Sequence, residues 1–220
     1  MSQEGFKQQI FNQFSLIGKS MSSPSRLELI DFLMQGERNV ETLAKLSHLS
    51  VANTSRHLQQ LKLAGIVKQR KEGQQVFYSL TGDRILELMN VIREVAEENN
   101  AMVHQLMHNF LEDKDQLEPL EQNELMERMK NNEILLIDVR PAEEFQSGHI
   151  SGAINLPMNR LKDEIEKLPQ EKEIIAYCRG PYCVLSILAV KELREKGKNV
   201  RRLKTGFPEW KLANLPVEKD

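Results

Sequence analysis

Cysteine is scarce in this sequence. Only two cysteines, Cys178 and Cys183, occur among its 220 residues, and they lie five positions apart in one segment. The disulfide framework of a small secreted protein needs several cysteines spread along the chain, so the sequence argues against this class. The close spacing instead indicates thiol chemistry in a single loop.

Long apolar runs are missing as well. No run reaches the roughly 18 apolar residues that a membrane-spanning helix requires. The first residues, MSQEGFKQQIFNQF, lack the basic and then apolar order of a secretion signal. We therefore expect a cytoplasmic protein without a membrane partner.

Neither sign of charge is in large excess, since the formal net charge is −2. This balance hides a basic segment at residues 50–75, where Glu72 is the one acidic residue beside Arg56, Lys62, Lys68, Arg70 and Lys71. A local excess of positive charge attracts nucleic acid. We expect double-stranded DNA to bind there.

The chain is long enough for two domains, because a typical domain has roughly 100 to 150 residues. Residues 6–113 have mostly helical patterns, whereas short β-branched runs alternate with helical patterns from residue 133 onward. The segment before the change is polar and charged and ends in Pro119, as a linker does. We predict a first domain over residues 1–112, a linker over 113–119 and a second domain over 120–220.

The first domain has helix-turn-helix spacing. A short amphipathic helix over residues 40–46 precedes a turn at residues 48–50 and a second helix that ends at Ala64. Gly65 suits the end of that helix, and two strands around a basic tip then form a wing. Short polar and cationic side chains there suit phosphates and base edges. The candidate DNA contacts are Ser50, Asn53, Thr54, Arg56, His57, Gln60, Arg70 and Lys71.

Three segments carry a resemblance to a known family: SSPSRLELI at residues 22–30, SVANTSRHL at 50–58, and LAGIV at 63–67 with its continuation through Tyr78. In this order they resemble the ArsR/SmtB family of winged-helix repressors, over roughly residues 10–110. The resemblance implies an all-α winged helix-turn-helix with a β-hairpin wing. It also implies a homodimer, formed by the first helix and a long helix near residues 83–111, on a two-fold operator.

Metal sensing is common in that family, and many members hold a Cys-x-Cys before the recognition helix. The matching positions here read Asn39-Val40-Glu41, and the first half has no cysteine. His104 and His108, four residues apart, share a helix face on which zinc or nickel can bind. Such pairs on polar helices are commonly solvated, so we assign no metal and no cofactor. A metal-responsive repressor that uses His104 and His108 stays an alternative.

The second domain has the pattern of a small parallel α/β fold. An apolar run at residues 134–140 ends in charged residues, as a buried parallel strand does. Further strand-like runs lie at residues 153–156, 173–177 and 199–203, and helical patterns at 161–168 and 184–196. Strands that alternate with helices predict one layered parallel sheet.

Cys178 falls where a predicted strand ends and the loop to the next helix begins. Backbone N–H groups and the positive end of a helix dipole lower the pKa of a thiol in such a place, and the thiolate is a nucleophile. We expect Ser186, in the first turn of that helix, to hydrogen-bond the sulfur. A buried cysteine without reactivity is the alternative reading.

Dense motifs surround this cysteine: LIDVRPAEEF at residues 136–145, GHISGAIN at 148–155, the pair Tyr177-Cys178, and GFPEW at 206–210. They resemble the rhodanese domain, over about residues 118–216. The resemblance implies that Cys178 accepts sulfur as a persulfide, in a loop of Arg179, Gly180, Pro181, Tyr182 and Cys183. It implies structural roles for Asp138, Arg140 and His149.

The loop departs from the usual rhodanese pattern, in which an arginine ends the loop and a glycine stands two places before it. Cys183 and Pro181 occupy these positions, which argues against thiosulfate as the substrate and against a phosphatase, whose loop-end arginine clamps the phosphoryl oxygens. Arg179 is the candidate to replace the missing charge. Cys183 can attack a persulfide on Cys178 and leave a disulfide, provided that the Cα atoms lie within about 7 Å.

These observations favour a DNA-binding regulator, a repressor, whose affinity for DNA follows the sulfur loading or oxidation of Cys178. A small sulfur-containing donor is then its ligand. One alternative is a thiosulfate or persulfide sulfurtransferase whose DNA-binding half acts independently. The other is the metal-responsive repressor.

Overall fold

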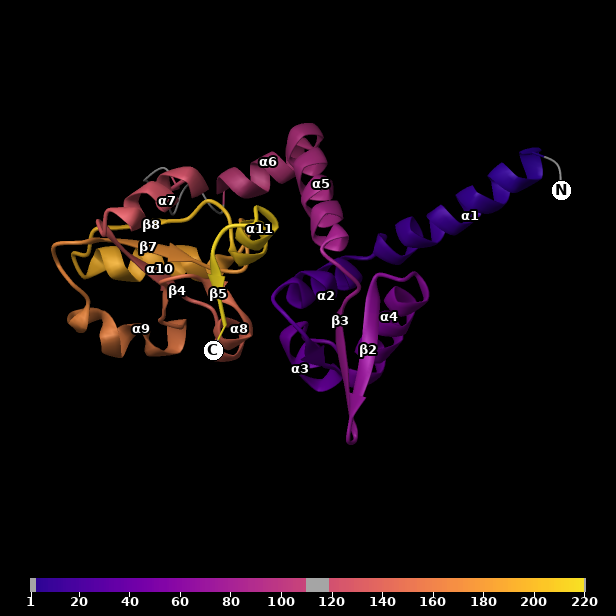
Figure 1. Cartoon of the computed structure of the whole chain (residues 1–220), viewed down its shortest axis with the longest axis horizontal. Coiled ribbons are helices and arrows are strands. Elements are labelled where there is room, and N and C mark those ends of the chain that lie inside the picture. Colours follow the sequence, from indigo (N-terminus) through magenta and orange to yellow (C-terminus); the bar gives the residue numbers. More distant parts are fainter. Residues whose placement is uncertain (1–2, 110–118, 220) are drawn as a thin grey trace. The chain divides into compact units, whose positions relative to one another are not determined.

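The computed structural model describes residues 3–109 and 119–219. The chain falls into two compact units, residues 1–85 and residues 86–220 (Figure 1). The predicted linker at residues 113–119 lies, except for Pro119, outside the described residues. The boundary between the units falls earlier, in the first turn of the helix that follows the wing.

The first unit has four helices, and local signals set the start of three of them. Pro24 opens the second helix, where its missing N–H costs nothing. The Asn39 side chain caps the third by accepting from the Thr42 amide at 2.8 Å. Ser50 caps the fourth by accepting from the Asn53 amide at 3.2 Å. These helices are α1 (Gln3–Met21), α2 (Pro24–Met34), α3 (Val40–Leu46) and α4 (Val51–Leu63).

A small antiparallel sheet completes this unit and forms the predicted wing. Strands β2 (Val67–Glu72) and β3 (Gln75–Leu80) pair from Val67 opposite Leu80 to Glu72 opposite Gln75, and β1 (Arg38–Asn39) adds to β3. Gly65 takes a φ of 74° at the end of α4, as expected of a glycine there. The fully buried core side chains come from α2, α3, α4 and the sheet: Leu29, Ile30, Leu43, Leu58, Leu61 and Tyr78.

The single long helix predicted near residues 83–111 is wrong. The structure has α5 (Arg84–Asn99) and α6 (Ala101–Met107), separated at Asn100. Asn100 has extended backbone angles, and its side chain accepts from the Met102 amide at 3.0 Å. A capping asparagine starts a new helix because its side chain replaces the backbone acceptor that a continuous helix would provide.

A four-stranded parallel sheet organises the second unit, in the order β6 (Ile154–Asn155), β4 (Ile134–Asp138), β7 (Glu173–Tyr177) and β8 (Val200–Arg202). All four strands coincide with the runs predicted from the sequence. A short antiparallel pair, β5 (His149–Ile150) and β9 (Val217–Glu218), was not predicted.

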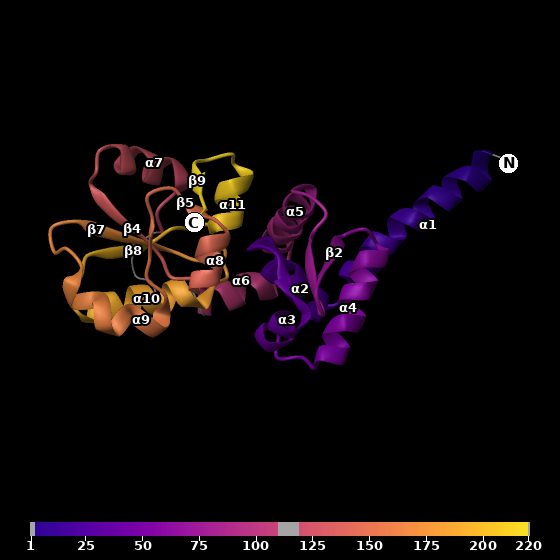
Figure 2. The same cartoon turned by 60° about the horizontal axis from the view of Figure 1, so that its bottom comes forward.

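Helices cover both faces of this sheet (Figure 2). Ile137, Ile174 and Ala176 face α9 (Met158–Glu164) and α10 (Val184–Glu195), and a 3-10 turn, Ile165–Lys167, follows α9. The alternate strand residues Leu136 and Ile175 face the other side, because successive strand side chains point to opposite faces. That side holds α7 (Gln122–Lys130), α8 (Ala142–Ser147) and α11 (Phe207–Leu212).

None of the helices in the described parts of the chain is both long enough and apolar enough to cross a membrane.

Candidate functional site

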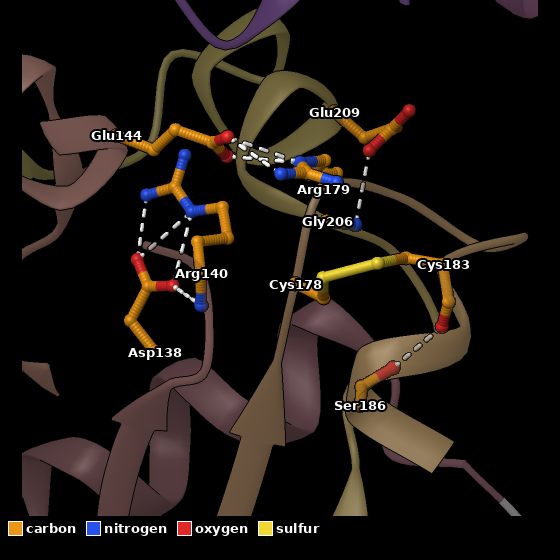
Figure 3. The surroundings of a disulfide bond; sticks show 9 residues. All are labelled: Asp138, Arg140, Glu144, Cys178, Arg179, Cys183, Ser186, Gly206 and Glu209. Atoms are coloured by element: carbon orange, nitrogen blue, oxygen red, sulfur yellow. Dashed lines mark hydrogen bonds and ion pairs between the residues drawn. A yellow bond between two sulfur atoms is a disulfide. The ribbon is translucent and has the colours of Figure 1, made fainter. Parts of the chain in front are cut away.

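The two cysteines lie at the two ends of one loop (Figure 3). Cys178 directly follows β7, and Cys183 is the N-cap residue of α10. Their sulfur atoms form a disulfide, and their Cα atoms are 6.2 Å apart. This separation lies within the limit of about 7 Å for a bridge. The loop is therefore short enough for the two cysteines to react with each other.

The two cysteines differ in exposure. Cys178 is only 1% exposed and belongs to the apolar cluster between the sheet and α9 and α10. Cys183 is half-buried and packs against the edge of that cluster. A small molecule thus meets Cys183 more readily than Cys178 while the bridge is closed.

The segment before α11 holds the loop from one side. The Phe207 amide donates to the Cys178 carbonyl at 3.2 Å. Gly206 packs so closely on the loop that a Cβ there would lie 2.3 Å from the Gly180 nitrogen. The Glu209 carboxylate accepts from the Gly206 amide at 2.9 Å and fixes the start of α11 (Figure 3). A side chain at position 206 would therefore displace the cysteine loop.

Arg179 does not replace the missing loop-end arginine. Its guanidinium points to Glu144 on α8 and donates to both carboxylate oxygens, at 3.0 and 2.7 Å (Figure 3). The Glu144 side chain is 3% exposed, so this charge-assisted pair is held away from water. The expectation that Arg179 supplies positive charge to a substrate is wrong, because a buried carboxylate already binds that charge.

A second buried ion pair lies beside the first. The side chains of Asp138 and Arg140 are both 0% exposed, and their closest oxygen and nitrogen atoms are 2.5 Å apart. Arg140 also donates to the Gly148 carbonyl at 2.8 Å and lies over the Phe207 ring, 4.5 Å from its centre. Both residues hold the strand end and the α8 loop together, as the rhodanese resemblance implied.

His149 is also buried and packs against neighbouring residues. Its ring stacks on Phe145, with ring centres 3.6 Å apart, and its Nδ1 lies 3.0 Å from the Phe145 carbonyl oxygen. The side chain is 3% exposed. These contacts support packing rather than proton transfer at the cysteine loop.

Ser186 does not bond to sulfur. Its hydroxyl donates to the Cys183 carbonyl at 3.2 Å, one turn back along α10 (Figure 3). Serine in the first turn of a helix often satisfies a nearby backbone carbonyl in this way. The sequence-based expectation of a Ser186 bond to the thiol is wrong in this bridged form.

A groove of about 470 Å³ opens at the carboxyl ends of the parallel strands. Such crevices are the usual ligand sites of open α/β sheets. Two of its lining residues, Met158 and Leu185, also pack against the apolar cluster that contains Cys178. Asn159 and Arg160 add polar groups to its wall. The groove therefore borders the apolar cluster that contains Cys178.

In the first unit, α4 contains five of the eight predicted DNA-contact residues and exposes three of them. Asn53, Arg56 and Gln60 are exposed along it. Arg56 donates to the Asn53 side chain at 3.3 Å, and the Gln60 side chain accepts from Arg26 at 2.8 Å. These exposed side chains share one surface of the second helix of the helix-turn-helix.

Two predicted DNA-contact residues on α4 are not fully exposed to solvent. Thr54 is fully buried, and its hydroxyl donates to the Ser50 carbonyl at 3.0 Å, so its assignment as a DNA contact is wrong. His57 is half-buried, and burial, then the charges of Arg26 and Arg56, lower its pKa below the usual value. His57 is therefore a neutral donor or acceptor near pH 7 rather than a cation.

The wing carries Arg70 and Lys71. Arg70 pairs with Glu37 at 2.6 Å and Glu72 at 2.5 Å, and these bonds raise its pKa. Its guanidinium also lies 4.5 Å from the centre of the Phe77 ring. Lys71 is exposed at the wing tip. Arg70 thus has its charge paired with two carboxylates, while Lys71 presents charge to solvent.

Comparison with known proteins fits both units. A model described as "Bacterial regulatory protein, arsR family" matches residues 23–69, and one for the rhodanese-like domain matches residues 121–213. The HTH-type transcriptional regulator Rv0324 of Mycobacterium tuberculosis is 38% identical over 213 residues, which cover 97% of this chain and 93% of that protein. The chain is an ArsR-family transcriptional regulator with a rhodanese-like domain.

Each half of this ArsR-family regulator has further relatives. Thiosulfate sulfurtransferase GlpE of Coxiella burnetii is 34% identical over 89 residues, 40% of this chain and 81% of that protein. The solution structure of the homodimeric winged helix-turn-helix domain of Mb0332 from Mycobacterium bovis has 31% identity and a TM-score of 0.43. The region of similarity covers 46% of this chain and 93% of the Mb0332 domain.

Sequence reasoning missed the acidic partners of the regulator's cysteine loop. Glu144 binds Arg179 from 35 residues away, and Glu209 binds Arg93 from 116 residues away. Glu97 accepts from the Tyr182 hydroxyl across 85 residues. The one local signal was the position of Glu209, three residues after Gly206, where a glutamate caps a helix start.

Within the described residues, the ArsR-family regulator has no group of three or more histidine, cysteine or acidic side chains that can hold a metal ion. His104 lies on α6, and His108 is the C-cap residue of that helix. The two histidines therefore stay one helical turn apart, with no third ligand beside them in the part of the chain that the structure describes, and the metal-responsive alternative stays a prediction.

Proposed function

We propose that this regulator is a homodimeric repressor whose affinity for its operator follows the sulfur state of Cys178 and Cys183. The observation that carries the proposal is the bridge between these cysteines in the loop of a rhodanese-like domain, on the same chain as a helix-turn-helix. A dithiol that closes and opens reversibly is a chemical switch. The homodimeric relative of the first unit supports the assembly.

The switch chemistry has two steps. The Cys178 thiolate attacks the outer sulfur of a persulfide donor, so that the donor's S–S bond breaks, a Cys178 persulfide forms and the donor leaves as its thiol. The Cys183 thiolate then attacks the inner sulfur of that persulfide and expels hydrosulfide, which takes the electron pair and becomes hydrogen sulfide. One donor thus oxidises the two cysteines to the disulfide and is itself reduced to thiol and sulfide.

Intact-mass spectrometry tests this chemistry directly. The wild-type protein, reduced and then given a low-molecular-weight persulfide, is expected to lose the mass of two hydrogens. Cys183→Ser is expected to gain the mass of one sulfur, because its persulfide has no second thiol to react with. If both proteins keep the reduced mass, the proposal fails at its first step.

The donor class follows from the charges around the loop. Arg179 is bound to Glu144, and the usual loop-end arginine is Cys183 here. A charge-assisted hydrogen bond to an anion contributes about 1.5–3 kcal/mol, so thiosulfate loses about tenfold or more in turnover without it. We infer that the donor is the persulfide of a small thiol, with its organic part in the groove at Met158 and Leu185.

Cys183→Arg is the corresponding test. The new arginine is expected to raise turnover of thiosulfate, with cyanide as the acceptor, by about tenfold relative to Cys183→Ser. Cys183→Ser is the matched control, because it removes the bridge without adding charge. Equal rates for the two variants would contradict the charge argument.

A sulfurtransferase that works independently of DNA binding is the second candidate. The similarity of the second unit to thiosulfate sulfurtransferase GlpE favours it. Efficient wild-type turnover of thiosulfate, together with operator binding that ignores the state of the cysteines, would support this candidate over the switch.

The proposed DNA contacts yield a separate prediction. We place Asn53, Arg56 and Gln60 of α4 in the major groove and Lys71 of the wing on a phosphate. Arg56→Ala is expected to weaken operator binding by about 5- to 150-fold, the effect of one lost specific contact. Fluorescence anisotropy at fixed salt measures it, with Lys191→Ala on the exposed surface of α10 as the control for lost charge. Equal weakening by both variants would contradict the placement.

A further inference from the structure

The outer end of the cysteine loop contacts α5. The Tyr182 hydroxyl donates to the Glu97 carboxylate, and the Arg93 guanidinium lies 5.7 Å from the centre of the Tyr182 ring. Burial, then the bond to Glu97, raises the pKa of Tyr182 above its usual range. The hydroxyl therefore stays protonated and remains a donor to Glu97. Tyr182 is also the residue directly before Cys183, so the bridge governs its position.

A second contact joins α5 to the opposite side of the loop. Arg93 pairs with Glu209 at 2.7 Å, and the two side chains are only 13% and 12% exposed. Glu209 also accepts from the Gly206 amide, and Gly206 packs against Gly180 of the loop. Arg93 is thus connected to the cysteine loop through Glu209 and Gly206.

The contacts with the loop occupy one face of α5. Arg93 and Glu97 are four residues apart, so they lie on the same face of the helix. Val91 and Val95 lie on the opposite face, where they are 51% and 53% exposed. An apolar exposed face of this kind suits the subunit contact of the proposed homodimer. The same helix thus presents one face to the cysteine loop and another to a second subunit.

The position of α5 in the chain matters for DNA binding. The wing strand β3 ends at Leu80, and α5 begins at Arg84. The boundary between the two units falls at residues 85 and 86, inside the first turn of α5. The connection between the wing and α5 is therefore short, residues 81–83.

We propose that α5 senses the state of the cysteine pair. In the disulfide form, the closed loop holds Tyr182 on Glu97 and Gly180 on Gly206, and α5 is ordered by both contacts. In the dithiol or persulfide form, residues 178–183 have more conformations, and the Tyr182 contact forms less often. The ordering of α5 then differs between the two forms, and the dimer and the wing respond. This coupling rests on the proposed function for its role in regulation.

Hydrogen exchange of the full-length protein tests the contact itself. The amides of residues 86–99 are expected to exchange at least about fivefold more slowly in the disulfide form than in the dithiol form. Glu97→Ala is expected to remove this difference, while Glu98→Ala, an exposed neighbour, keeps it. Glu97 is not part of the sulfur chemistry, so the bridge should still form in both variants, as intact mass verifies.

Operator binding tests the consequence. The ratio of operator Kd values for the disulfide and dithiol forms is expected to fall to within about twofold of unity in Glu97→Ala. Tyr182→Phe removes the other partner of the same contact, so the double variant should have no larger effect than either single variant. This second variant keeps the test decisive if Glu97→Ala folds poorly, which the fluorescence of Trp210 would reveal.

The outcomes distinguish the coupling through α5 from the proposed regulation of operator binding. If Glu97→Ala and Tyr182→Phe both keep the wild-type exchange difference and Kd ratio, the coupling through α5 is overturned while the sulfur switch stands. If the wild-type Kd does not depend on the bridge, although the exchange of residues 86–99 does, the proposed regulation fails while the contact stands. If wild-type exchange over residues 86–99 is the same in both forms, the coupling is overturned.

Discussion

Cys178→Ser is expected to abolish the response of operator binding to a persulfide donor. A serine hydroxyl neither accepts sulfane sulfur nor forms a bridge, so Cys183 is left without a partner. In the wild-type protein, the donor is expected to weaken operator binding by about 5- to 150-fold, the usual range of coupling between two sites. Fluorescence anisotropy with reduced and donor-treated protein measures both values at one salt concentration, because DNA affinity depends strongly on salt.

Cys183→Ser identifies the signalling species. This variant stops at the Cys178 persulfide, because no second thiol is present to expel the sulfide. Loss of the response in Cys183→Ser would identify the disulfide as the signal, whereas a normal response would identify the persulfide. A Cys178→Ser protein that still responds like the wild type would exclude both, and with them the proposed switch.

Arg140→Ala is expected to lower the free energy of unfolding of the second unit by about 3–5 kcal/mol. The substitution leaves the Asp138 carboxylate buried at 0% exposure without its guanidinium partner. An unpaired charge in the interior has a large desolvation cost, and removal of one partner of a buried pair has this magnitude. Trp210, the only tryptophan and fully buried in this unit, reports the transition by its fluorescence in urea.

Two further variants test whether the unpaired Asp138 charge causes the loss of stability. Lys191→Ala removes an exposed charge from the same unit and is expected to change stability by less than about 0.5 kcal/mol. The double variant Asp138→Leu with Arg140→Leu removes both charges and is expected to be less harmful than Arg140→Ala, since no buried charge is left alone. A loss below about 1 kcal/mol in Arg140→Ala would show that water reaches Asp138.

Local chemistry explains why much of the fold is readable from the sequence. The helix-turn-helix follows from caps at Asn39 and Ser50 and a glycine at Gly65 in the left-handed region. The parallel sheet follows from apolar runs that are buried on both faces. Each of these signals acts within a few residues, so a sequence pattern contains it completely.

The partners of charged side chains were not predictable in the same way. Arg179 binds Glu144 rather than a substrate because the sheet and α8 bring together two residues 35 positions apart. Thr54 is fully buried, although its polarity suits DNA. Sequence spacing gives the face of a helix but not what packs against it, so these assignments needed the tertiary structure.

The size of the bridged loop has a thermodynamic consequence. Cys178 and Cys183 are five residues apart, and in the chain-entropy model the cross-link of so short a loop restricts the unfolded chain by only about 2 kcal/mol, against nearly 5 kcal/mol for a 100-residue loop. The rhodanese-like unit should therefore keep its fold when the bridge is reduced. A cross-link that contributes little to global stability can cycle many times without exposing the protein to unfolding or proteolysis.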